Sequence, residues 1–441
     1  MTPRILLVNP PVHDFAAYDF WLKPYGLLSV AGYLRGKAHF RLFDYLDRLH
    51  PFMARQKALA SDRWGRGRFY EQRIDNPPCL EQIPRYFRRF GLPRNLFQDF
   101  IAREKRFDFA LVQTTMTYWY PGVEEVIQDI RKISPPTKIV LGGNYVTLCS
   151  GHAKNFRADL LVRGTNLEPL WKYLGIEPDL NQPALWEAYE KLRVGALKLS
   201  DGCPFECTYC SVPQVYGRFK ARPLEWSLAE LVLLAKCGAK NIAFYDDALL
   251  FKPEEVLVPF LNELMRRGIK VNLHSPNALN ARFVTKDLAR LMVHAGFKTF
   301  YLGFESCSVE WQKRTGSKVF SDELERAVKH LVSAGAQASN ITAYQMLGHP
   351  YGDAAELEAS MRFVHSLGIH GMLADFSPIP GTPDGEYCRR WVDMNEPLMH
   401  NKTAFPIIML GFDESNRLKD LQRRLNRSLT GNSSIDCGQS S

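Results

Sequence analysis

The sequence has no long apolar run, although 46% of its 441 residues are hydrophobic and 23% are charged. A helix that spans a membrane needs about 20 consecutive, mostly apolar residues, and no stretch of this chain reaches that length without polar interruption. The opening segment, MTPRILLVNPP, is broken by two prolines too early to act as a secretory signal. We therefore expect a cytoplasmic protein without a membrane segment.

Regularly spaced cysteine pairs are also absent. Most of the nine cysteines are scattered singly, but Cys203, Cys207 and Cys210 lie close together. Disulfide frameworks need an even number of cysteines in a regular pattern, so this arrangement excludes such a framework and indicates a bound metal in a reducing compartment. The chain shows no second cysteine cluster, no internal repeat and no Gly-x-x-x-x-Gly-Lys nucleotide loop.

Strands and helices alternate on both sides of a predicted linker at about 175–192. One hydrophobic core usually serves no more than about 250–300 residues, so two units are expected. In the first unit, residues 1–174, the alternation predicts a doubly wound, Rossmann-like sheet with ligands beyond the carboxyl ends of its strands. The predicted strands are 4–9, 39–46, 109–115, 138–144 and 159–164, and the predicted helices are 26–34, 123–133 and 167–174.

A basic, aromatic-rich insertion at about 47–105 interrupts the first unit. The formal net charge of the chain is +9, and much of it lies here. Arginines pair with phosphates and aromatic rings stack on bases, so a nucleic-acid site is one interpretation. We favour the other, in which the insertion is a lid over the shared cleft and its arginines cover apolar surface.

The second unit, residues 193–385, repeats the strand–helix pattern. This predicts a partial (β/α)6 version of the TIM-like parallel barrel, with its chemistry at the carboxyl ends of the strands. A helical extension at 386–425 and a polar tail at 426–441, expected to be disordered, complete the chain. The predicted strands are 194–200, 241–246, 270–274, 299–304, 340–347 and 371–376, and the predicted helices are 226–237, 254–267, 285–295, 321–334 and 354–367.

The clustered cysteines lie in the run DGCPFECTYC, directly after the first strand of the predicted barrel. Thiolates are the soft ligands that iron–sulfur clusters select, and a four-iron cluster normally has four of them. Three thiols would leave one iron open for a substrate group. The alternative is structural zinc, which prefers four ligands and would need a distant one such as His274.

This motif resembles the cluster loop of the radical S-adenosylmethionine (SAM) superfamily. The resemblance implies that Cys203, Cys207 and Cys210 bind a [4Fe-4S] cluster whose open iron holds the methionine part of SAM. Other motifs at predicted strand ends resemble the family's SAM contacts, although FYDD replaces its usual Gly-Gly-Glu and His349 stands where other members often have an apolar residue. The implied contacts are Tyr209 and Gly348 near the adenine, Asp246 or Asp247 at the ammonium, and Glu305 and Ser306 at the ribose.

The first unit resembles the N-terminal, cobalamin-binding-type domain of one radical SAM subgroup, through ILLVNPP, YGLLSVAGYL, LGGN and LVRG. The resemblance covers about residues 4–415 and implies cobalamin contacts. The histidine-bearing Asp-x-His-x-x-Gly element of other cobalamin proteins is absent, so a domain that has kept the fold and lost the cofactor is an open alternative. The implied contacts are Thr114, Thr115, Gly142 and Gly143.

The sequence therefore predicts a radical SAM enzyme that cleaves SAM reductively to a 5'-deoxyadenosyl radical. Cobalamin-dependent methyl transfer or a radical rearrangement would follow, on a small-molecule or peptide substrate that the sequence does not identify. Cluster reduction implies an electron donor such as flavodoxin or ferredoxin. Two alternatives stay open: a radical SAM enzyme without cobalamin, and a non-catalytic zinc- or cluster-bearing protein that binds nucleic acid. The sequence assigns no catalytic residue.

Overall fold

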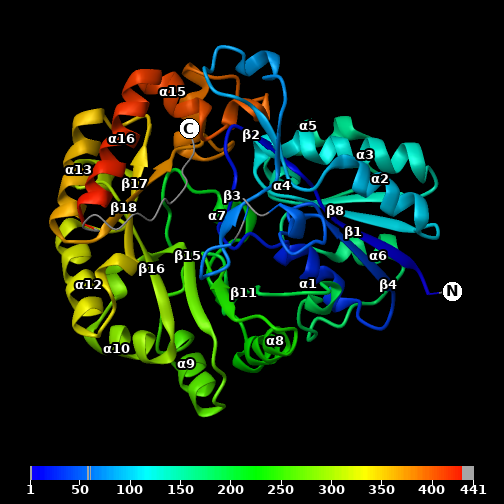
Figure 1. Cartoon of the computed structure of the whole chain (residues 1–441), viewed down its shortest axis with the longest axis horizontal. Helices are drawn as coiled ribbons and strands as arrows, with labels where there is room; N and C mark the ends of the chain where they lie inside the picture. The colour runs from blue at the N-terminus through cyan, green and yellow to red at the C-terminus, as the bar shows by residue number, and fades with distance from the viewer. Residues whose placement is uncertain (1, 57–58, 60, 430–441) are drawn as a thin grey trace.

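The computed structural model describes residues 2–56, 59 and 61–429. Two parallel sheets dominate it, one on the N-terminal side and one in the second half of the chain (Figure 1). No helix in the described ranges has the length and hydropathy needed to cross a bilayer. The fold class is the predicted one, a doubly wound α/β unit followed by a partial barrel.

The N-terminal sheet has the strand order β10-β9-β8-β1-β4, and all its pairings are parallel. In chain order this is a flavodoxin-like arrangement, in which ligands bind at the switch point between the first and third strands. That switch point lies between the carboxyl ends of β1 and β8. The strands are β1 (Arg4–Asn9), β4 (His39–Asp44), β8 (Phe109–Thr114), β9 (Lys138–Gly143) and β10 (Leu160–Val162).

Helices cover both faces of this sheet because the strands carry apolar side chains on both faces. Leu6 and Val8 of β1 pack in one core, while Ile5 and Leu7 pack in the other. Helices α2 and α3 complete the first core, and α1 and α6 complete the second (Figure 1). The helices of this unit are α1 (Tyr25–Tyr33), α2 (Arg94–Arg103), α3 (Tyr120–Ile133), α4 (Asn144–Leu148), α5 (Ser150–Ala153) and α6 (Glu168–Leu174).

The second sheet has six parallel strands in chain order, from β11 to β18, and its two outer strands do not pair with each other. It is therefore an open, partial barrel, as predicted. A large apolar core lies between the strands and the surrounding helices. The strands are β11 (Val194–Leu197), β14 (Asn241–Phe244), β15 (Asn272–Asn280), β16 (Phe297–Glu305), β17 (Ile341–Leu347) and β18 (His370–Asp375); the outer helices are α8 (Leu224–Lys236), α9 (Leu257–Arg266), α10 (Lys286–Ala295), α12 (Ser321–Ser333) and α13 (Ala354–Ser366).

Two features of these units differ from the sequence prediction. β15 extends to Asn280 through a register shift between Ser275 and Leu279, whereas the sequence predicted a strand that ends at residue 274. The end of the predicted insertion is α2, the regular crossover helix between β4 and β8. Its buried side chains, Phe97 and Ile101, form a narrow apolar stripe among arginines, and this is why the sequence did not reveal the helix.

The rest of the insertion is divided between the N-terminal sheet and the barrel. One part forms small antiparallel sheets beside the carboxyl edge of the N-terminal sheet, where Phe69 and Phe90 pack with Trp119. The other part enters the barrel, where Trp64 joins Trp21 and Tyr301. The lid prediction was therefore only partly right, because Trp64 fills the barrel interior. The small strands are β2 (Val12–Asp14), β3 (Tyr18–Asp19), β5 (Gly67–Arg68), β6 (Glu71–Arg73) and β7 (Arg88–Phe90).

Several arginines of the insertion bind the protein itself. Arg48 is almost completely buried and donates to the carbonyls of Leu59 and Gly65. Arg89 forms a buried, two-pronged ion pair with Glu125. These side chains are not free to contact phosphates, so the nucleic-acid interpretation loses part of its basis.

The chain after the barrel packs across both units. Leu398 and Ile407 contact Phe87 and Leu80 of the insertion. Helix α16 (Phe412–Leu429) packs against β18 and α13 (Figure 1). α16 runs to Leu429, so the helix continues into the segment predicted to be a disordered tail, and residues 430–441 lie outside the described residues. The remaining helices are α7 (Val212–Val215), α11 (Val309–Thr315), α14 (Pro383–Tyr387), α15 (Ala404–Leu410) and α16 (Phe412–Leu429).

Candidate cluster and SAM site

The cysteine loop follows β11 at the carboxyl edge of the barrel, and its backbone is tightly held. The Cys210 N–H donates to the Cys207 carbonyl at 3.0 Å, and the Cys203 N–H donates to the Gly217 carbonyl at 3.4 Å. Gly202 has a φ of +71°, and a Cβ there would lie 2.5 Å from the Arg218 carbonyl oxygen. This turn therefore requires glycine, and it fixes the backbone position of the next residue, Cys203.

All three thiols are partly exposed and carry no disulfide. Burial raises the pKa of each, and the pKa of Cys210 reaches about 12. Lys318 and the Tyr209 hydroxyl oppose this rise at Cys207. The Val212 N–H points at the Cys210 sulfur from 3.5 Å. Because metal binding displaces the thiol proton, these groups favour the thiolate form that iron requires.

The donor set is the one that a four-iron cluster with one open iron would use. Zinc needs all its ligand atoms within about 2.0–2.3 Å of one point. Among the residues that the structure describes, no three His, Cys, Asp or Glu side chains form such a group. A four-iron cluster binds each thiolate at a different iron, so its ligands do not need to converge. The donor set, three cysteines on one loop, suits this geometry.

His274 does not supply the fourth ligand considered for zinc. Its ring is buried in the barrel, hydrogen-bonded to Thr299 and Asn241 at 3.0 and 3.1 Å, and stacked on Trp21. Burial and the nearby Arg66 lower its pKa to about 3. The histidine is a neutral core residue that already has its partners.

Lys318 is a functional candidate that the sequence did not reveal. Its ammonium group donates to Glu305 Oε1 at 3.0 Å, and its charge acts on Cys207 and Cys210. A Cβ at Gly303 would lie 2.9 Å from the Lys318 Nζ, so this glycine of β16 makes room for the ammonium. The pair places one cation and one carboxylate beside the thiols.

The two aspartates after β14 have different environments. Asp246 is buried and accepts from the Leu199 N–H at 3.0 Å and the Ser200 hydroxyl at 2.6 Å. Asp247 Oδ2 is buried without a hydrogen-bond partner within the described chain, 3.9 Å from Lys198 Nζ. Burial raises the pKa of Asp247 to about 6. Asp246 therefore holds the chain at Leu199 and Ser200, just before the cysteine loop. Asp247 has an oxygen that can still accept a hydrogen bond from an ammonium group.

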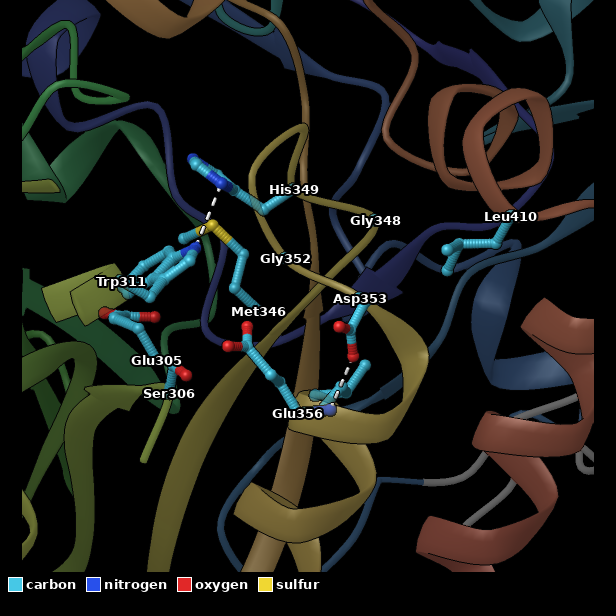
Figure 2. A pocket seen from close by; sticks show the side chains of 11 residues that line it. Glu305, Ser306, Trp311, Met346, Gly348, His349, Gly352, Asp353, Glu356 and Leu410 are labelled. Atoms are coloured by element: carbon cyan, nitrogen blue, oxygen red, sulfur yellow. Dashed lines mark hydrogen bonds between the residues drawn. The ribbon is translucent and has the colours of Figure 1, made fainter. Parts of the chain in front are cut away.

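The remaining SAM candidates gather around a hollow between the ends of β16 and β17 and the start of α13 (Figure 2). Glu305 and Ser306 line it, and Glu305 has a φ of +68°, which is uncommon for a residue other than glycine. Tyr209 lies close by, with its ring 6.2 Å from that of Trp311. Gly348 also lines the hollow, but a Cβ there would lie 2.6 Å from Pro406 of α15. Packing against that helix is sufficient to explain this glycine.

The cobalamin candidates lie at the carboxyl ends of β8 and β9, and most of their polar groups have partners inside the protein. The Thr114 hydroxyl donates to the Gly142 carbonyl at 3.0 Å and accepts from the Val146 N–H. A Cβ at Gly143 would clash with the Thr114 carbonyl, whereas one at Gly142 would make only ordinary contacts. Thr115 lines a hollow at the β1/β8 switch point with Asn9, Pro10 and Gln113.

Comparison with known proteins identifies the class of the second unit. Residues 197–364 match the radical SAM superfamily, so this part of the chain is a radical SAM domain. A domain of this kind binds a [4Fe-4S] cluster and SAM, and the three cysteines, Lys318 and Asp247 all lie within the matched residues.

Particular relatives extend the likeness to both units. The fold is similar to that of TsrM, a radical SAM methyltransferase from Kitasatospora setae, with a TM-score of 0.63 at 14% identity over 88% of this chain and 76% of that one. It is also similar to OxsB, a cobalamin-dependent SAM radical enzyme, with a TM-score of 0.56 at 14% identity over 96% and 61%. At these identities the likeness establishes the fold alone.

Curated relatives match in sequence over part of the chain. An uncharacterized methyltransferase of Pyrococcus horikoshii is 27% identical over 44% of this chain and 41% of its own length. The threonylcarbamoyladenosine tRNA methylthiotransferase MtaB of Thermotoga maritima is 26% identical over 59% and 64%. The chain thus spans less than two thirds of the length of these relatives.

Proposed function

We propose that this protein is a radical SAM enzyme that cleaves SAM reductively at a [4Fe-4S] cluster and transfers a methyl group with the help of cobalamin. The observation that carries the proposal is the set of three free thiols on one loop, next to a cation and two carboxylates. An electron carrier would need only the thiols. The additional charged groups suit a zwitterionic substrate such as the methionine part of SAM.

Cys203, Cys207 and Cys210 would hold the cluster, which in its reduced form would supply the single electron that breaks the C5'–S bond of SAM and gives methionine and the 5'-deoxyadenosyl radical. The protein binds and orients the reactants. Asp247 accepts hydrogen bonds from the ammonium group, because a carboxylate is its natural charge-assisted partner. Lys318 stabilises the thiolates and the Glu305 carboxylate, which binds the ribose together with Ser306. The barrel residues exclude water and thereby protect the radical.

Cobalamin is the second part of the proposal. The similar structures of TsrM and OxsB were determined with cobalamin bound, and the hollow at the β1/β8 switch point is where a doubly wound sheet binds ligands. The Thr115 hydroxyl would contact the cofactor there, and the small Gly142, at the end of the neighbouring strand β9, would let it approach the backbone. A second SAM molecule would supply the methyl group and leave as S-adenosylhomocysteine, and the cofactor would carry that methyl group to the substrate.

The substrate, the electron donor and the location belong to the same proposal. A small molecule or a peptide would bind between the two units. A flavodoxin or ferredoxin would reduce the cluster. The free thiols are compatible with a reducing, cytoplasmic environment.

The test is anaerobic reconstitution with iron and sulfide, followed by dithionite and SAM. We expect a brown protein that releases 5'-deoxyadenosine, and a C203A/C207A/C210A variant that does not. Zinc alone in the metal analysis would favour the nucleic-acid-binding alternative. Turnover without retention of added hydroxocobalamin would favour the radical SAM enzyme that uses no cobalamin.

A further inference from the structure

The side chain of His349 is almost completely buried. It lies in the turn after β17, and the Trp311 indole points at it (Figure 2). Burying a polar ring is costly unless its nitrogens are hydrogen-bonded. Both nitrogens of His349 have partners, and these lead to the cluster loop.

The hydrogen bonds fix the position of the proton on the His349 ring. The Trp311 indole N–H donates to Nδ1 at 3.1 Å, and the Tyr351 N–H approaches the same nitrogen at 3.3 Å. An indole N–H can only donate, so Nδ1 is an acceptor. The proton is therefore on Nε2, which donates to Asp384 Oδ2 at 3.0 Å.

Asp384 connects this histidine to the cluster loop. The same Oδ2 atom accepts from the Thr208 hydroxyl at 2.6 Å. The Asp384 N–H also donates to the Thr208 carbonyl at 3.2 Å. Thr208 lies between Cys207 and Cys210, so two hydrogen bonds join one buried residue to the middle of the cluster-binding segment.

Three segments that are distant in the sequence therefore meet at one buried carboxylate: the cluster loop, the turn after β17 and the start of α14. Asp384 is only 1% exposed. A negative charge in such a place acts over short distances with little screening by solvent. Net charge and hydrogen bonding near an iron–sulfur cluster are among the factors that set its reduction potential.

We propose that Asp384, oriented by His349, is a positioning residue for the cluster: it holds the Cys207–Cys210 segment through Thr208, and its charge lowers the reduction potential. This inference rests on the proposed function and adds a regulator of electron entry to it. A cluster with a lower reduction potential is a stronger reductant. SAM is difficult to reduce, so its cleavage needs such a cluster.

The experiment uses the reconstituted full-length protein and three variants. Asp384→Asn removes the charge and keeps the size and one acceptor oxygen. Thr208→Val removes the hydroxyl and keeps the charge. Glu386→Gln is the matched control, because Glu386 lies on the same short helix but is exposed and paired with Arg389. The readouts are the midpoint potential of the cluster and the rate at which a chelator removes iron.

We expect Asp384→Asn to shift the potential to a less negative value and Glu386→Gln to leave it unchanged. Thr208→Val should keep the potential of the parent protein and lose iron to the chelator several-fold faster. An unshifted potential in Asp384→Asn, or an unchanged iron-loss rate in Thr208→Val, would overturn the inference. If Asp384→Asn assembles no cluster, Thr208→Val decides, since it keeps every buried charge.

Failure of the proposed function and failure of the role of Asp384 give different results. If the parent protein itself binds no iron or leaves SAM intact under dithionite, the proposed function fails. If the parent protein is active and the variants have its potential and its iron-loss rate, only the role of Asp384 fails.

Discussion

The carboxyl edges of the two sheets have opposite chemistry. At the barrel edge, groups with unfilled capacity face one another: three free thiols, the unpartnered oxygen of Asp247 and the ammonium group of Lys318. At the N-terminal edge, Thr114 already has partners in its own sheet. The barrel edge is therefore suited to charged, directional ligands, whereas the other edge offers mainly backbone groups and a complementary shape. A cobalamin there would be held mainly by packing.

The largest expected effect is at the cysteines. Alanine at Cys203, Cys207 or Cys210 removes one thiolate, and we expect loss of most of the bound iron and of SAM cleavage, measured by iron analysis and nucleoside release. Cys237, at the end of α8, is the matched control. If its replacement by alanine had the same effect, the cysteine loop would not be a specific cluster site.

The second prediction concerns Lys318. Replacing one partner of a fully buried ion pair typically costs about 3–5 kcal/mol. The Lys318 side chain is 20% exposed, so solvent partly screens the ion pair. We therefore expect Lys318→Met to lower the free energy of unfolding by about 2 kcal/mol. Urea unfolding measures this value. The exposed neighbour Lys313→Met should change it by less than about 0.5 kcal/mol.

The third prediction concerns pH and Asp247. Its pKa is raised to about 6, so the carboxylate is charged above that value and becomes protonated as the pH falls through it. We expect SAM affinity to fall about fourfold between pH 7.5 and 5.5, because the ionised fraction of a group with a pKa of about 6 falls by about that factor and only the carboxylate form makes the charge-assisted hydrogen bond. Equilibrium dialysis measures the affinity. In Asp247→Asn the affinity should be low and independent of pH, and a parent-like pH profile in this variant would contradict the assignment.

The smallest effects separate the two glycines of the N-terminal edge. Gly143 has a φ of +118° and no room for a Cβ, so Gly143→Ala should destabilise the fold by about 1–3 kcal/mol. Gly142→Ala should leave thermal unfolding unchanged, since its Cβ would make only ordinary contacts. It should weaken retention of hydroxocobalamin, measured from the visible spectrum. Equal retention in Gly142→Ala and the parent protein would place the cofactor elsewhere or exclude it.

The sequence was sufficient to predict the main strands and helices because their apolar residues repeat with clear periods. The predicted helix 285–295 and α10 differ by one residue at the start, and this helix has both a Thr285 cap and a closing Gly296. α2 was missed because only Phe97 and Ile101 are buried among its charges. The location of Trp64 inside the barrel depends on contacts between distant segments, which periodicity does not encode.

The site was predictable where residue type alone decides the chemistry. Three cysteines at this spacing predict a bound metal without any knowledge of the surrounding fold. The roles of Asp246 and Asp247 could not be separated, since only the fold determines which carboxylate meets the Leu199 N–H. Lys318 reaches the site because the chain after α11 passes over Gly303, and no local pattern in the sequence indicates that path.

The most direct test of the central claim is a Mössbauer spectrum of the anaerobically reconstituted protein, recorded with and without SAM. The account predicts a four-iron cluster in which one iron site changes its signal when SAM is added and the others do not, because three irons carry thiolates and one is open. A spectrum that SAM leaves unchanged, or a protein that takes up zinc in place of iron, would contradict it.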